Sequence, residues 1–170
     1  MVTEEIEVGV IVERRVLVSR WADHSWMPVA VLAGAPAAAP WTVLEETPET
    51  TRFYAGPWRL TFYASETTMY RENLRSGRPS LWVSLRAAAT PPGVTLRLVT
   101  ADPSEAEALT EPGTDIIEPV PMPPEIRHGL AAFVEAHHVE RPFVKRKRDR
   151  PDPEALARRP PGLRSGEDEG

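Results

Sequence analysis

Residues 81–99 read LWVSLRAAATPPGVTLRLV, and this stretch holds the two strongest strand signals of the chain. Apolar residues alternate with other residues in 81–85 and again in 94–98, which is the period of a half-buried strand. The sequence Pro-Pro-Gly at 91–93 predicts a turn between the two strands. Two strands joined by a short turn pair antiparallel, so we expect an antiparallel sheet.

On both sides of this stretch the sequence predicts more strands, most of them short. Ile6, Val8, Val10 and Val12 alternate with other residues and should share one face of a strand. Residues 19–28 interrupt the pattern and are expected to form an ordered loop. Gly56-Pro57 predicts a turn between two strands of a hairpin. The additional strands are expected at 16–18, 29–32, 41–45, 52–55, 58–63 and 115–118.

Three helices are expected, two of them short. One covers 65–74, and the next begins at Asp102, which can cap a helix whose first turn holds Pro103 and Glu105. The last is amphipathic and begins after the prolines at 119–124. Its apolar stripe consists of Ile126, Leu130, Phe133, Val134 and His137. The fold class predicted is α+β: a curved antiparallel sheet or small barrel with two short helices and one C-terminal amphipathic helix.

Charge divides the chain into a domain and a tail. Residues 1–140 hold 11 Arg and 19 Asp or Glu, a net charge of −8, whereas 141–170 hold 9 Lys or Arg and 6 Asp or Glu, a net charge of +3. We expect one α+β domain at 1–140, a basic arm at 141–150 and a disordered, Pro-rich tail at 151–170. The arm suggests docking on an acidic partner surface. A solvated tail that aids solubility is the alternative.

Composition excludes several classes of function. The chain has no cysteine, so disulfides, thiol nucleophiles and cysteine-ligated metals are excluded. The acidic N-terminus does not read as a secretory signal, and no apolar run reaches the roughly 18 residues that a membrane span needs. We therefore expect a cytoplasmic protein that does not bind membranes.

The loop SRWADHSW at 19–26 is a candidate pocket. Together with the C-terminal helix it offers five residues: Trp21, Asp23, His24, Trp26 and His137. Neighbouring residues cannot form a catalytic triad by spacing alone, and an alternative is a loop whose polar side chains only hold the turn. His137 and His138 point about 100° apart on a helix, which does not suit one metal ion. No catalytic residue, metal or cofactor is assigned.

Two further segments were considered for binding. The loop 32–36, LAGAP, follows a strand, but its proline lacks an N–H and no lysine follows, so we expect a tight turn and not a phosphate site. The basic arm offers five partner-binding residues: Phe143, Lys145, Arg146, Lys147 and Arg148. Nucleic acid is a weaker alternative partner for the arm, because Phe143 is its single aromatic residue and no recognised module is present.

Several segments in this order resemble an uncharacterised proteobacterial family, a domain of unknown function. They are 19–26, 28–32, 41–44, 53–56, 70–74, 91–94, 99–101, 115–118 and 132–148. Members of that family are typically encoded beside molybdenum-dependent formate dehydrogenase genes and their maturation factors. Some carry the label molybdopterin-guanine dinucleotide biosynthesis protein A. The chain departs from that enzyme's Gly-rich loop, because Leu32-Ala33-Gly34 is followed by Ala35-Pro36.

The resemblance implies a non-enzymatic accessory or maturation protein associated with a molybdenum-dependent formate dehydrogenase. In this interpretation the partner is formate dehydrogenase or one of its maturation factors. A nucleotide- or cofactor-handling protein of molybdopterin-guanine dinucleotide biosynthesis is the alternative.

Overall fold

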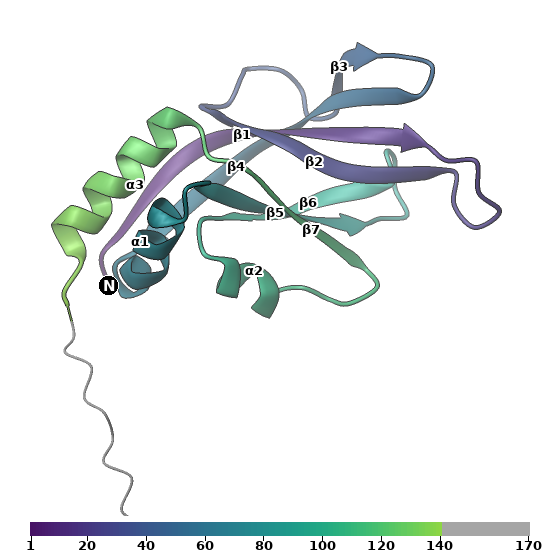
Figure 1. The fold of residues 1–170 in the computed structure, drawn as a ribbon. Helices are drawn as coiled ribbons and strands as arrows, with labels where there is room; N and C mark the ends of the chain where they lie inside the picture. The colour runs from purple at the N-terminus through teal and green to yellow at the C-terminus, as the bar shows by residue number, and fades with distance from the viewer. Residues whose placement is uncertain (141–170) are drawn as a thin grey trace, which may run out of the picture. The chain divides into compact units, whose positions relative to one another are not determined.

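The computed structural model describes residues 1–140, which hold seven strands and three α-helices (Figure 1). The strands are β1 (Thr3–Val16), β2 (His24–Ala33), β3 (Thr42–Glu46), β4 (Thr50–Tyr63), β5 (Ser80–Ala87), β6 (Val94–Thr100) and β7 (Asp115–Pro121). The helices are α1 (Thr67–Arg75), α2 (Pro103–Ala108) and α3 (Pro124–His137), and a 3-10 turn, η1 (Ala64–Glu66), precedes α1.

The first sheet has the strand order β2-β1-β4-β3 and is antiparallel throughout. Its centre is β1, whose Val8, Val10 and Val12 are fully buried on one face, as the alternation predicted. The opposite face carries Gly9 and Glu13. Because β1 has 14 residues, it spans about 45 Å at the usual rise per residue.

The second sheet has the order β6-β5-β7 and is also antiparallel. Residues 81–99 form β5, a turn and β6, which confirms the antiparallel pair predicted for this stretch. Leu81, Val83 and Leu85 are fully buried on one face of β5. β7 is an edge strand, so its Pro119 and Pro121 can be accommodated although they lack an N–H.

A single hydrophobic core joins both sheets and the helices. Valines of β1 and leucines of β5 belong to it, together with Ile126, Leu130 and Phe133 of α3. The two sheets lie one above the other, and α1 and α3 cover the end where β1 begins (Figure 1). Phe133 contacts Phe62 and Tyr70, with ring centroids 5.7 and 6.4 Å away. Residues 1–139 form one compact unit.

The predicted hairpin across Gly56-Pro57 is wrong. Residues 50–63 form one continuous strand, β4, which pairs with β1 along its whole length. Gly56 has a φ of +125°, and the register with β1 shifts beside it, between Val10 and Ile11. These are the features of a β-bulge, in which glycine accommodates an extra residue without ending the strand.

The predicted loop at 19–28 is too long. β2 begins at His24, which pairs with Val16 at the end of β1. The predicted run 16–18 is not a separate strand, because Val16 belongs to β1 and residues 17–23 connect β1 to β2. Period-two alternation does not reveal this end of the hairpin, because it projects beyond the buried core and most of its residues are exposed.

The structure is mostly β, with two antiparallel sheets and few helices, which confirms the predicted antiparallel pairing; of the two predicted alternatives, a curved sheet or a small barrel, it shows the curved, open sheet. The strands are divided between two sheets, a division that the sequence did not predict. No helix within residues 1–140 is long and apolar enough to cross a membrane. The predicted basic arm 141–150 and the predicted disordered tail 151–170 lie outside the described residues.

Candidate functional site

Three of the candidate pocket residues lie at the tip of the β1–β2 hairpin. The side chain of Trp21 is 93% exposed, and Asp23 and His24 are exposed as well. The hairpin is closed by a backbone hydrogen bond of 2.9 Å from Leu17 N to Asp23 O. Nothing in this arrangement brings the Asp23 carboxylate and the His24 imidazole into a buried site.

Trp26, the fourth residue, turns inward and joins an aromatic cluster. Its ring lies 6.0 Å from Trp41 and 5.8 Å from Phe53, measured between centroids. The Arg14 guanidinium lies over both Trp26 and Phe53, at 5.8 and 5.2 Å. The cluster packs against the edge of the core, and the cation stabilises the exposed side of the rings.

His137, the fifth residue, lies on α3, at the other end of the molecule. Its ring packs on Phe133 at 4.6 Å, as expected for a residue that completes the apolar stripe. α3 covers the start of β1, whereas Trp21 follows the end of that strand, so the length of β1 separates them (Figure 1). The structure therefore does not bring the five candidate pocket residues together.

His138, which the sequence offered only as a poor metal ligand, ties α3 to α1. Arg71 Nη1 donates to His138 Nε2 at 3.1 Å, and His138 Nδ1 lies 3.0 Å from Thr67 Oγ1. Because a guanidinium can only donate, Nε2 is the acceptor and the proton sits on Nδ1, which donates to Thr67. Within residues 1–140, no group of three His, Asp or Glu side chains is arranged to hold a metal ion.

Residues 31–36 line an open depression of about 560 Å³, together with Pro123 and Glu125 at the start of α3. The two prolines at the beginning of this helix, Pro123 and Pro124, have no N–H to offer an anion, and Glu125 adds negative charge. The depression therefore does not suit a phosphate, in agreement with the prediction for the loop.

Two buried tyrosines, Tyr54 and Tyr70, have raised pKa values because of their burial in the fold. Burial raises the pKa of Tyr70 to about 12, and its hydroxyl accepts a hydrogen bond of 3.0 Å from Tyr63 N. Burial, with a smaller effect of Glu7, also raises the pKa of Tyr54. Both phenols therefore stay protonated at neutral pH, and neither can serve as a base there.

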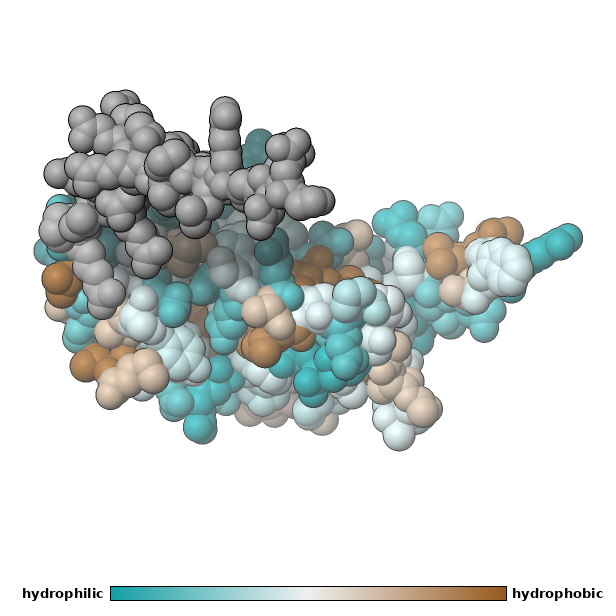
Figure 2. All heavy atoms as spheres, turned by 90° about the horizontal axis from the view of Figure 1, so that it is seen from below, coloured by the Kyte–Doolittle hydropathy of each residue, from teal (hydrophilic) through white to brown (hydrophobic). Residues whose placement is uncertain are grey.

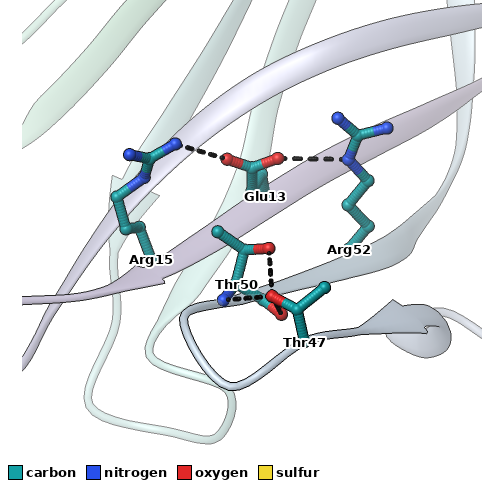
Figure 3. A network of polar contacts seen from close by, with 5 residues as sticks. All are labelled: Glu13, Arg15, Thr47, Thr50 and Arg52. Carbon is teal, nitrogen blue, oxygen red and sulfur yellow. Dashed lines mark hydrogen bonds and ion pairs between the residues drawn. The ribbon is translucent and has the colours of Figure 1, made fainter.

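An ion-pair network covers the outer face of the first sheet (Figure 3). The Glu13 carboxylate lies 3.1 Å from Arg52 Nε and 3.5 Å from Arg15 Nη2, and its side chain is only 15% exposed. Near it, Thr47 and Thr50 exchange hydrogen bonds in the turn between β3 and β4. Both arginines are thus engaged by Glu13, which leaves the acidic residues of β3 without these partners.

The distal end of the first sheet, residues 13–27 together with β3, exposes apolar side chains. Of the ten large apolar side chains exposed within residues 1–140, six lie here: Val16, Val18, Trp21, Met27, Val43 and Leu44. The tip of the β1–β2 hairpin projects from the body in Figure 2, where hydrophobic side chains lie beside hydrophilic ones. Exposed apolar surface can mark a contact site, and we regard the distal end as a candidate docking surface.

Sequence reasoning missed the exposed apolar residues of β3. The predicted strand 41–45 agrees with β3, but neither Val43 nor Leu44 was singled out. Their exposure could have been inferred from the sequence. Adjacent residues of a strand point to opposite faces, so Val43 and Leu44 cannot both enter one core. The predicted partner-binding residues Phe143, Lys145, Arg146, Lys147 and Arg148 lie outside the described residues.

The fold and these surfaces define a small, mostly β protein whose distal end is a candidate docking surface. Residues 7–147 match the family described as "Protein of unknown function (DUF3305)". The match covers most of the chain, and the chain belongs to this family. No curated protein and no solved structure matches the chain. The resemblance to a family of unknown function is thereby confirmed.

Proposed function

We propose that the chain is a non-enzymatic, cytoplasmic accessory protein for a molybdenum-dependent formate dehydrogenase. In this proposal residues 143–148 dock on an acidic surface of the enzyme or of one of its maturation factors. The observation that carries the proposal is the segregation of charge: −8 in residues 1–140 against +3 in residues 141–170. Both lysines of the chain, Lys145 and Lys147, lie in this short basic segment.

The structure supports the proposal through the way in which α3 ends. His138 follows the last helical residue, and its imidazole is bonded to Thr67 and Arg71 of α1. The described chain is therefore held on the domain as far as His138, five residues before the basic segment 143–148 begins.

Co-purification with a tagged formate dehydrogenase tests the proposal. We expect the wild-type chain to be retained at low salt and the double variant Lys145→Glu/Lys147→Glu to be lost, because charge reversal turns attraction into repulsion. The double variant Arg158→Glu/Arg159→Glu changes the net charge equally outside the basic segment and should still bind. No retention of the wild-type chain at low salt, or equal loss of both variants, would contradict the proposal.

A nucleotide- or cofactor-handling protein of molybdopterin-guanine dinucleotide biosynthesis is the second candidate. It is supported by the label that some members of the family carry, and not by the depression beside residues 31–36, which does not suit a phosphate. A thermal-shift experiment with GTP, molybdopterin and Mg²⁺ tests it, because a ligand at 100 times its dissociation constant stabilises the folded state by about 2.7 kcal/mol. An unchanged melting temperature with all three ligands would argue against this function.

The basic segment also leaves nucleic-acid binding to be tested. Phosphate contacts by the four basic residues at 145–148 would give an affinity that falls with rising salt and does not depend on sequence. Binding of this kind, with no retention by formate dehydrogenase, would replace the proposed function.

A further inference from the structure

The outer edge of β3 has no partner strand within the described part of the chain. β3 lies at the edge of the first sheet and pairs only with β4. All five of its residues are exposed, and the side chains of Val43 and Leu44 are 49% and 52% exposed. An edge of this kind presents unpaired N–H and C=O groups, to which another extended segment can add.

The negative charge of β3 determines which kind of strand can bind to its edge. Glu45 and Glu46 end the strand, and Glu49 lies in the turn that follows. Within residues 1–140 no ion pair reaches these three carboxylates, because nearby Arg52 is bonded to Glu13. Two copies of β3 paired in the same direction would place Glu45 and Glu46 beside their own counterparts, and paired in opposite directions would place these carboxylates beside Leu44 and Val43, so neither self-pairing is favoured. A basic strand would instead be attracted.

The chain itself contains a segment with the complementary order of residues. β3 contains Val-Leu-Glu-Glu at 43–46, and the basic segment contains Phe-Val-Lys-Arg at 143–146. Placed side by side in the same direction, the two strands bring apolar residues next to apolar residues and carboxylates next to cations. The opposite direction would place the cations beside Val43 and Leu44, so the parallel pairing is favoured.

The segment cannot reach β3 of its own molecule. α3 ends beside α1 and η1, next to Tyr63, whereas β3 begins opposite Tyr54, about 30 Å farther along β4. Phe143 lies five residues beyond His138, and five residues extend over at most about 18 Å. The complementary strand must therefore come from a second copy of the chain.

We infer that β3 is the docking site for residues 143–146 of a second copy. If each copy supplies its segment to the other, two identical contacts form a closed dimer. The inference does not rest on the proposed function, since it concerns where a basic strand binds on this chain. It adds that the segment is shared: an acidic partner and β3 of the second copy compete for it.

Sedimentation equilibrium of the full chain, at 50 mM and at 500 mM salt, tests the inference. We expect a monomer–dimer equilibrium that weakens at high salt. Either double variant, Glu45→Lys/Glu46→Lys or Lys145→Glu/Arg146→Glu, should raise the dimer dissociation constant about tenfold or more. Combining all four substitutions should restore dimerisation, because the charges are then exchanged but again complementary.

The control is Glu72→Lys/Glu107→Lys, which changes the charge equally at two exposed positions on α1 and α2. It should leave the dimer unchanged. A monomer at every concentration would overturn the inference, as would equal weakening by the control or failure of the combined variant to dimerise. The β3 variant should still be retained by formate dehydrogenase, so that failure of one proposal can be told from failure of the other.

Discussion

The side-chain amide of Asn73 joins three segments that are distant in the sequence. Its Nδ2 donates to Ser80 O at 2.8 Å and to Ala101 O at 3.0 Å, while its Oδ1 accepts from Ser80 N at 3.0 Å. Asn73 is buried at the end of α1, where β5 begins. The sequence correctly predicted that Asn73 lies in a helix. It did not predict the role of its side chain, because the hydrogen-bond partners are 7 and 28 residues away and leave no local pattern.

We predict that Asn73→Ala lowers the free energy of unfolding by about 3 kcal/mol, because one buried and two partly buried backbone groups lose their partner. Asn73→Asp keeps an acceptor for Ser80 N but loses the donor, so it should also be destabilising. Urea denaturation followed by circular dichroism measures both. Glu72→Ala, on the exposed side of the same helix, is the control and should change the free energy by less than about 0.5 kcal/mol. Equal, small effects at both positions would contradict the assigned role.

Two glycines show how the same residue serves different elements. Gly9 lies in β1, and a Cβ added there would stand 3.0 Å from Tyr54 Cε2, 3.1 Å from Pro36 Cδ and 3.3 Å from Gly34 O. Gly129 lies in α3, and its Cβ would meet only Ile6 Cδ1, at an ordinary 3.7 Å. The close approach of Pro36 and Tyr54 thus explains Gly9, whereas no neighbour requires glycine at position 129.

We predict opposite signs for the two alanine substitutions. Gly129→Ala should raise the free energy of unfolding by up to about 1 kcal/mol, because alanine is the better helix former. Gly9→Ala should lower it by about 1–3 kcal/mol, because buried neighbours must shift to admit a methyl group. Melting temperatures of the two variants measure the difference. A stabilising Gly9→Ala would show that the neighbours move aside at little cost.

Helices and strands whose signals lie in neighbouring residues were predicted correctly. Strand boundaries that depend on pairing with a distant strand were not. The helix stripe of α3 and the β5–β6 hairpin were correct, because their signals are local periodicity and a turn. Gly56-Pro57 carries the composition of a turn, yet pairing with β1 on both sides keeps β4 continuous. The candidate pocket failed to assemble for the same reason: Trp21 and Trp26 are five residues apart, but only one of them lies over the core.

The molecule consists of two sheets packed on one core. In the smaller sheet, β6-β5-β7, an ion pair joins the end of β5 to the start of β7. Arg86 of β5 lies opposite Asp115 of β7, and its Nε and Nη2 donate to the two carboxylate oxygens at 2.7 and 2.9 Å. The Asp115 side chain is fully buried, and its carboxylate also accepts from Glu111 N at 2.9 Å. These hydrogen bonds, first that of Arg86, lower the pKa of Asp115 to about 2.

The lowered pKa gives the folded state a defined dependence on acid. Asp115 titrates near pH 3.8 in the unfolded chain and near 2 in the folded one, so its stabilising effect is complete above about pH 5. As pH falls from about 4 to about 2, the unfolded chain takes up the proton first, and the stabilisation is lost. Arg86 stays charged throughout this range.

We predict that Asp115→Asn lowers the free energy of unfolding at pH 7 by about 2 kcal/mol, because a charged, bidentate hydrogen bond is lost. The difference from the wild-type chain should shrink as pH falls below about 4 and become small near pH 2. Urea denaturation at pH 7, 5, 4, 3 and 2 measures it. Glu111→Gln is the control: its carboxylate lies 3.8 Å from the same arginine but is 67% exposed, so it should contribute little at any pH. A difference for Asp115→Asn that stays constant down to pH 2 would mean that side-chain shape, and not the carboxylate charge, stabilises this end of the sheet.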